Sequence, residues 1–101
     1  MFARVTTFHT KPGAKDEAIQ ASREGPLAAA REENGFKGFL ILVDPEGNSG
    51  FGITLWESEG DLQASEGAGG YYDEQMARMS ALLDGSPKRE VYEVALLEME
   101  A

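Results

Sequence analysis

Hydrophobic and polar positions along this chain follow two different periods. A period of two residues is typical of β-strands, whose side chains point alternately to the two faces. This period occurs in four segments, namely Phe2–His9, Phe36–Val43, Ser49–Trp56 and Arg89–Met99. A helical spacing of small residues runs from Ala14 to Glu33, and a second helical stripe comprises Tyr72, Met76, Met79 and Leu83. The predicted order is therefore strand, helix, strand, strand, helix, strand.

Turn and capping residues indicate where these elements begin and end. Asp44–Asn48 is a strong turn signal, so the second and third strands are expected to form an antiparallel hairpin. Ser58 is the expected N-cap of a short helix that continues to about Ser65. Pro26 follows Gly25 within the first helical region, and proline lacks the N–H that a helix interior uses. We therefore expect a kink or break there.

One predicted strand, Phe36–Val43, is apolar on both faces. Strict alternation places Phe39, Ile41 and Val43 on one face and Phe36, Leu40 and Leu42 on the other. Two helical regions in a chain of 101 residues can cover only one face of a four-stranded sheet. The sequence therefore predicts a homodimer in which two copies pack together through the helix-free face.

Composition narrows the class of protein. A chain of 101 residues is expected to form a single domain, residues 1–101. The absence of cysteine excludes disulfides and thiolate nucleophiles. A net charge of −9 disfavours binding to nucleic-acid phosphates. The longest apolar run, Phe39–Val43, is too short to span a bilayer, and no signal peptide is visible. We therefore expect a cytoplasmic protein without a nucleic-acid or membrane partner.

Three short segments carry a family resemblance: Asn34–Gly38 before the second strand, Thr54–Glu59 at the end of the third, and Glu90–Val94 in the last. They resemble the antibiotic biosynthesis monooxygenase-like domains of the dimeric α+β barrel superfamily. The resemblance spans nearly the whole chain. It implies an α+β, ferredoxin-like βαββαβ domain, with a four-stranded antiparallel sheet, helices on one face, and pairing into a dimeric barrel. This group includes cofactor-independent oxygenases of polyketide quinones, haem-degrading enzymes and proteins without known activity.

Two functions of different classes follow from this resemblance. One is a monooxygenase-like enzyme that acts on a small aromatic or polyketide-type molecule without any cofactor. The other is a non-catalytic, small-molecule-binding or stress-associated homodimer. An oxygenase of the first kind needs a dry pocket, a base and hydrogen-bond donors for an oxyanion. The candidate base is His9, and the candidate ligand-binding residues are Trp56, Tyr72, Met76 and Arg4.

Each candidate also has a purely structural interpretation. His9 is also interpreted as a strand-end or interface histidine, and Trp56 as a core residue at a strand-to-helix corner. Tyr71, Tyr72 and Met76 have the spacing that any packed helix needs. For Arg4, an inward position requires a carboxylate partner or an anionic ligand, whereas a rim position requires neither.

Neither haem degradation nor a metal site is predicted. The resemblance to haem-degrading members would require an asparagine, a tryptophan and a histidine where this chain has Thr6, Ser65 and either Gln75 or Met76. A single histidine without cysteine also makes a poor metal site. Three glycines in Glu66–Gly70 interrupt the second helical region, which is interpreted either as a mobile lid over a pocket or as a plain connector.

Overall fold

The computed structural model, which describes residues 1–100, has the element order expected from the sequence. In chain order the elements are β1 (Phe2–His9), α1 (Lys15–Ser22), η1 (Arg23–Leu27), α2 (Ala28–Ala30), β2 (Phe36–Val43), β3 (Ser49–Trp56), α3 (Glu59–Ala64), α4 (Tyr72–Met79), η2 (Ser80–Leu82) and β4 (Lys88–Glu93). The first three strands have the predicted bounds, and the fold is the predicted ferredoxin-like α+β arrangement.

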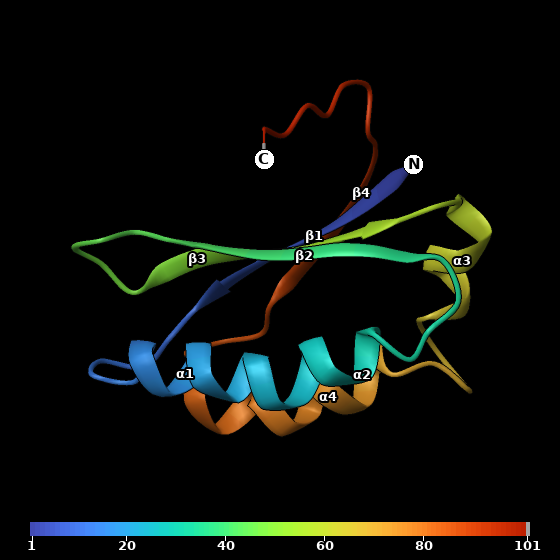
Figure 1. Ribbon diagram of the computed structural model, residues 1–101. Coiled ribbons are helices and arrows are strands. Elements are labelled where there is room, and N and C mark those ends of the chain that lie inside the picture. The colour runs from blue at the N-terminus through green and yellow to red at the C-terminus, as the bar shows by residue number, and fades with distance from the viewer. Residues whose placement is uncertain (101) are drawn as a thin grey trace.

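The four strands form one antiparallel sheet in the order β2-β3-β1-β4. In the centre of the sheet, Arg4 of β1 lies opposite Thr54 of β3 and Val91 of β4. The α1–α2 region and α4 cover the same face, while α3 lies at one end of the sheet (Figure 1). Within residues 1–100, the opposite face carries no helix.

The first helical region does not break at Pro26. Its middle turn, η1, is a π-helix, and the helical backbone continues from α1 through η1 into α2 (Figure 1). A π-helical turn has i→i+5 hydrogen bonds and occurs mostly as a single-turn bulge within an α-helix. Pro26 is buried there, so the residue expected to interrupt the helix packs into the domain instead.

A β-bulge changes which face of β2 carries one of its aromatic residues. The pairing of β2 with β3 shifts register between Phe36 and Gly38. One extra residue in a strand reverses the alternation, because side chains alternate with a period of two. Phe36 therefore packs against Trp56 on the covered face, with ring centroids 5.8 Å apart, instead of sharing a face with Leu40. The simple alternation expected from the sequence was wrong at this position.

The last strand is shorter than expected, since β4 ends at Glu93 and not at Met99. Its only neighbour in the sheet is β1, and the last registered pair joins Phe2 to Glu93. One further bond joins the Val94 N–H to the Met1 carbonyl at 2.9 Å.

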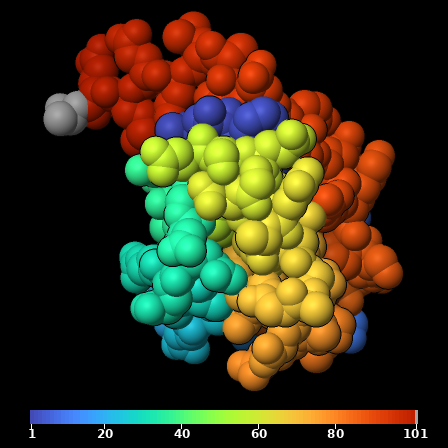
Figure 2. All heavy atoms as spheres, turned by 90° about the vertical axis from the view of Figure 1, so that its right-hand side faces the viewer, coloured from blue at the N-terminus to red at the C-terminus, as the bar shows by residue number. Residues whose placement is uncertain are grey.

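The predicted N-cap of α3 is confirmed. The Ser58 hydroxyl accepts a hydrogen bond from the Asp61 N–H at 3.1 Å, which makes Ser58 the N-cap of this helix. Figure 2 shows the segment containing α3, coloured yellow, covering one end of the molecule between the start of β2 and β4.

The two faces of the sheet differ in how far they are covered. Two clusters fill the space between sheet and helices: Ala30, Trp56, Leu62 and Tyr71 in one, and Ala18, Met79 and Leu83 in the other. On the helix-free face, four large side chains stay exposed in the single chain: Leu40 at 40%, Leu42 at 48%, Phe51 at 44% and Tyr92 at 52%. The expectation of an uncovered apolar face is confirmed for the single chain.

Candidate functional site

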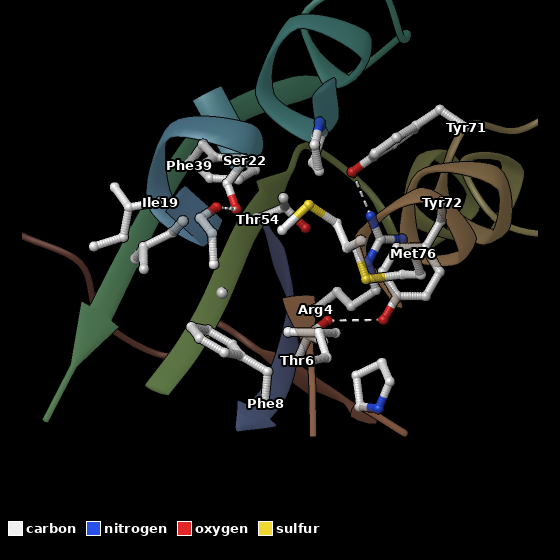
Figure 3. Close-up of a pocket in the computed structure, with 17 residues that line it drawn as sticks. Arg4, Thr6, Phe8, Ile19, Ser22, Phe39, Thr54, Tyr71, Tyr72 and Met76 are labelled. Atoms are coloured by element: carbon white, nitrogen blue, oxygen red, sulfur yellow. Dashed lines mark hydrogen bonds between the residues drawn. The ribbon is translucent and has the colours of Figure 1, made fainter. Parts of the chain in front are cut away.

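The candidate site is a cavity of about 60 Å³ between the helix-covered face of the sheet and the helices above it. Figure 3 shows the seventeen residues that line it. Most of the lining is apolar and comes from both layers, including Phe8, Phe39 and Ile41 on the strands and Ile19, Met76 and Met79 on the helices. A lining of this composition offers few hydrogen-bond partners to water.

Arg4 is the charged residue of the cavity lining, and its side chain is only 1% exposed. It points inward because it alternates with Thr6 and Phe8 on the covered face of β1. Its Nη1 donates to the Ser65 hydroxyl at 2.7 Å, and its Nη2 donates to the Tyr71 hydroxyl at 2.5 Å (Figure 3). These bonds hold the guanidinium at one end of the cavity.

Three aromatic rings surround the Arg4 guanidinium. Its central carbon lies 4.0 Å from the ring centroid of Tyr72, 5.5 Å from that of Tyr71 and 5.6 Å from that of Trp56. Distances within about 6 Å are typical of cation–π contacts, which stabilise a buried cation. The three rings therefore help to stabilise the buried charge of Arg4, in addition to its ion pair with Glu66.

The carboxylate of Glu66 connects Arg4 to a second arginine. Its Oε2 accepts from Arg4 Nη1 at 3.2 Å and from Arg89 Nε at 2.5 Å, and its Oε1 accepts from Arg89 Nη2 at 2.7 Å. Burial raises the pKa of Glu66, but hydrogen bonds from Arg89 and Arg4 and the charges of both outweigh burial and lower the pKa. Glu66 therefore stays ionised at neutral pH.

Hydroxyl groups supply the remaining polar chemistry of the cavity. The hydroxyls of Tyr72 and Thr6 lie 2.8 Å apart (Figure 3), and the Trp56 Nε1–H donates to the Thr54 hydroxyl at 2.8 Å. Burial raises the pKa of Tyr71 more than the nearby Arg4 charge lowers it. Tyr71 therefore stays a neutral phenol at physiological pH and keeps an O–H that can donate to a ligand.

The structure brings together three of the five predicted site residues, because Arg4, Tyr72 and Met76 all line the cavity. Trp56 is fully buried at 0% exposure, and it lies behind Arg4 in the core and not in the lining. His9 is exposed and alternates onto the opposite face of β1, away from the cavity. Its catalytic role stays a prediction.

Sequence reasoning missed several contributors to the site. From the sequence, Thr6 was considered only as a position where haem-degrading relatives have another residue. Two-residue alternation from Arg4 could have placed Thr6 on the same face of β1, toward the cavity. The participation of Ser65, Glu66 and Arg89 had no sequence signal, since Ser65 and Glu66 lie 61 and 62 residues from Arg4 in the chain.

The glycine-rich segment Glu66–Gly70 forms a tight connection between α3 and α4. Gly67 and Gly69 adopt positive φ angles of 69° and 88°, which glycine tolerates best. A Cβ on Gly70 would lie 2.2 Å from the Ser65 carbonyl oxygen, so only glycine fits there. The segment is tied down at Glu66 and is not part of the cavity lining as described. A role as a lid stays a prediction.

Within residues 1–100, no group of three or more His, Cys, Asp or Glu side chains is arranged to hold a metal ion. No helix in the same range is both long and apolar enough to cross a membrane.

The fold and the cavity define an α+β domain that encloses a mainly apolar site between its sheet and helices. The family model of the antibiotic biosynthesis monooxygenases matches residues 1–73, and the chain belongs to this family. No curated protein matches the chain.

Solved structures with the same fold include proteins of known and unknown function. A monooxygenase from the gene ActVA-Orf6 of Streptomyces coelicolor, in complex with nanaomycin D, is 23% identical, with a TM-score of 0.81 over 99% of this chain and 92% of that one. SnoaB, a cofactor-independent oxygenase from Streptomyces nogalater, is 18% identical, with a TM-score of 0.77 over 98% and 97%. A protein of unknown function from Nitrosomonas europaea is 21% identical, with a TM-score of 0.77 over 99% and 94%. At these identities the likeness establishes the fold.

Proposed function

We propose that this protein is a cofactor-independent monooxygenase that acts on a small aromatic or polyketide-type molecule in the cavity. The observation that carries the proposal is the division of the cavity into an apolar body and one polar end. Phe8, Phe39 and Ile41 offer an apolar surface to a ring, while Arg4 and Tyr72 lie at the polar end. Ligand sites commonly combine these two features.

Membership of the family and two of the structural relatives support this choice. One relative is a monooxygenase with a bound ligand, nanaomycin D, and another is a cofactor-independent oxygenase. In the proposed reaction, a CH₂ group of an electron-rich ring system becomes a carbonyl. Two C–H bonds break, one atom of O₂ enters the substrate, and the other leaves as water with both hydrogens. The substrate supplies the electrons that reduce O₂.

The side chains of the cavity would serve this reaction by exclusion of water and by hydrogen bonding. Negative charge develops on oxygen atoms during reduction of O₂, and donors held in a dry site stabilise such charge strongly. The neutral phenol of Tyr71, the hydroxyl of Tyr72 and the guanidinium of Arg4 are donors of this kind.

The size of the cavity sets a condition on substrate entry. Its volume of about 60 Å³ is smaller than the cavity of about 150 Å³ that admits benzene in an engineered protein. A ring therefore enters only if side chains of the lining move. Met76 and Met79 are suited to this, because methionine has three rotatable bonds and adapts to irregular space.

The proposed active form is a homodimer that pairs through the helix-free face. Support comes from the exposed apolar side chains of that face and from Leu96 and Met99 after β4, which are 87% and 80% exposed in the single chain. The segment that carries them extends on the helix-free side of the sheet (Figure 1). Burial of one large apolar side chain contributes roughly 1.5–3 kcal/mol, so several such side chains favour pairing. The cytoplasmic location stays a prediction from the sequence.

A non-catalytic binding protein is the second candidate function. The observation that favours it is the absence of any carboxylate or imidazole among the residues described as lining the cavity. An enzyme that removes a proton from its substrate ordinarily holds such a base within hydrogen-bond reach.

Oxygen consumption distinguishes the two candidates. The protein is mixed with a panel of dihydroxyaromatic compounds and anthrones, and O₂ uptake is followed with an electrode. We expect uptake with at least one compound, and a loss of roughly 10- to 100-fold in Tyr72→Phe, which removes one donor at the polar end. Ser80→Ala is the control, because it removes a hydroxyl group at an exposed position after α4, outside both the cavity lining and the helix-free face. No uptake across the panel contradicts the oxygenase and leaves the binding protein.

A further inference from the structure

The polar end of the cavity carries the positive charge of Arg4. Two guanidinium groups, those of Arg4 and Arg89, share the single carboxylate of Glu66. The shorter contacts of that carboxylate go to Arg89, at 2.5 and 2.7 Å, and the longer one goes to Arg4, at 3.2 Å. The three groups of this cluster together carry a charge of +1, but the charge of the Asp73 carboxylate also acts on Arg89, so the positive charge that reaches the cavity is that of Arg4, the member that lines it.

Arg4 also retains hydrogen-bonding capacity toward the cavity. A guanidinium has five N–H donors, and three hydrogen bonds from Arg4 reach Ser65, Glu66 and Tyr71. Within residues 1–100, no acceptor lies in hydrogen-bond range of its Nε–H. No fully buried side-chain nitrogen or oxygen in that range lacks a partner, so this Nε keeps a small accessible surface, although Arg4 as a whole is only 1% exposed. Because Tyr72 contacts the face of the guanidinium, a ligand oxygen would approach along its edge.

Among the residues described as lining the cavity, no side chain is a base that could take a proton from a ligand. The described lining contains neither a carboxylate nor an imidazole, and His9 lies on the other face of the sheet. A ligand whose hydroxyl group ionises only with the help of an enzyme base would therefore remain neutral in the cavity. A ligand that loses its proton to bulk water beforehand would enter as an anion and meet a cation.

We propose that the cavity binds its ligand as an oxygen-centred anion held by Arg4, and that it thereby selects aromatic compounds with an acidic hydroxyl group. The substrate class is a phenol or enol made acidic by conjugation to an electron-withdrawing group such as a carbonyl. This specificity rests on the proposed function, because it concerns the same cavity, but it predicts binding and not turnover. Arg4 is then the specificity-determining residue.

The overall charge of the protein has the opposite sign to that of this site. A net charge of −9 repels an anion at long range, while Arg4, which is 1% exposed, attracts it only at short range. Selection therefore depends on contact with Arg4, and moderate salt is expected to speed the approach of an anion without abolishing its binding.

The test uses 4-nitrophenol, whose phenolate form absorbs visible light and whose proton dissociates near neutral pH. Absorbance is followed as a function of pH with the protein in excess. Contact with an opposite charge at a few ångströms ordinarily favours the charged form by one pKa unit or more. We therefore expect the apparent pKa of the bound probe to fall by at least about one unit, which corresponds to at least tenfold tighter binding of the phenolate than of the phenol. The non-ionisable 4-nitrotoluene reports on entry to the cavity alone.

Two substitutions at the cluster are expected to act in opposite directions. Arg4→Met removes the cation and should abolish the pKa shift of 4-nitrophenol while 4-nitrotoluene still binds. Glu66→Gln removes the competing carboxylate, which is not part of the cavity lining, and should enlarge the shift. General damage to the fold would weaken both variants, so opposite signs separate the electrostatic effect from misfolding. Arg31→Met is the matched control, because Arg31 is exposed beyond the end of α2.

The outcomes are distinct from those of the oxygen-uptake assay. An unshifted or raised pKa of the bound probe would overturn anion selection, and so would failure of both probes to bind. A shift that persists in Arg4→Met would overturn the assignment to Arg4. A lowered pKa without any oxygen uptake would retain anion selection and contradict the oxygenase, whereas uptake without a shift would retain the oxygenase alone.

Discussion

The two faces of the sheet are built from the same strands but differ in how far their side chains are buried. On the covered face, even a charged residue is enclosed, since Arg4 is 1% exposed. On the helix-free face, even large apolar residues remain accessible, since Leu42 is 48% and Phe51 is 44% exposed. Adjacent positions such as Phe39 and Leu40 fall on different sides of this division. Burial in this protein is therefore set by which layer covers a face, more than by the polarity of the residue.

The largest expected effect is on the covered face. Trp56→Ala should lower the free energy of unfolding by about 3–5 kcal/mol, because it leaves a cavity and deprives the Thr54 hydroxyl of its donor. Urea denaturation followed by circular dichroism measures the change at one protein concentration. Arg31→Ala, at an exposed position, should stay within about 0.5 kcal/mol of wild type. A similar loss in both variants would contradict the placement of Trp56 in the core.

A charge placed on the helix-free face tests the proposed pairing. Leu42→Glu should weaken dimerisation by about 2–3 kcal/mol, or roughly 30- to 150-fold in Kd, because an unpaired carboxylate would be buried between two sheets. Chromatography with light scattering over a range of concentrations measures the mass. Gln20→Glu adds the same charge on the outer surface of α1 and should leave the mass unchanged. A wild-type protein that is monomeric at micromolar concentration would refute the dimer.

Low pH should weaken the ion pairs of Glu66 with Arg4 and Arg89 on the covered face. The pKa of Glu66 is lowered in the folded state, so its contribution to stability is present above its unfolded-state pKa and is lost as pH falls through the folded-state value. Wild type should therefore lose more stability than Glu66→Gln between neutral pH and about pH 3. Parallel urea titrations measure both proteins. Identical pH dependence in the two would show that the carboxylate is not stabilised by Arg4 and Arg89.

The smallest effect on oxygen uptake is expected for a substitution of His9. This residue is the predicted base, but its observed position is outside the cavity lining. His9→Ala should leave oxygen uptake unchanged, because the side chain points away from the cavity on the helix-free face. The electrode assay on purified protein of matched concentration measures the rate. A loss of tenfold or more would restore His9 as a base and would require a route to the cavity through a second copy.

Local signals accounted for most of the fold. Two-residue alternation and the Asp44–Asn48 turn signal predicted β2 and β3 to the residue, since strands and turns depend on neighbours in sequence. A kink or break was predicted at Pro26, and the structure has an irregular π turn there while the helical region remains continuous. The bulge beside Phe36 was missed, because it arises in the pairing of two strands and leaves no mark in either one alone.

The amino-acid sequence by itself determined the order of the elements, the bounds of three strands and the presence of an apolar face that the helices leave bare. It also named Arg4, Tyr72 and Met76 as candidates that line the cavity. Only the tertiary structure decided that Arg4 shares Glu66 with Arg89 and that His9 lies outside the cavity. The physical reason is that periodicity acts between near neighbours, whereas the charges of this site meet across strands and loops that only the packed fold brings together.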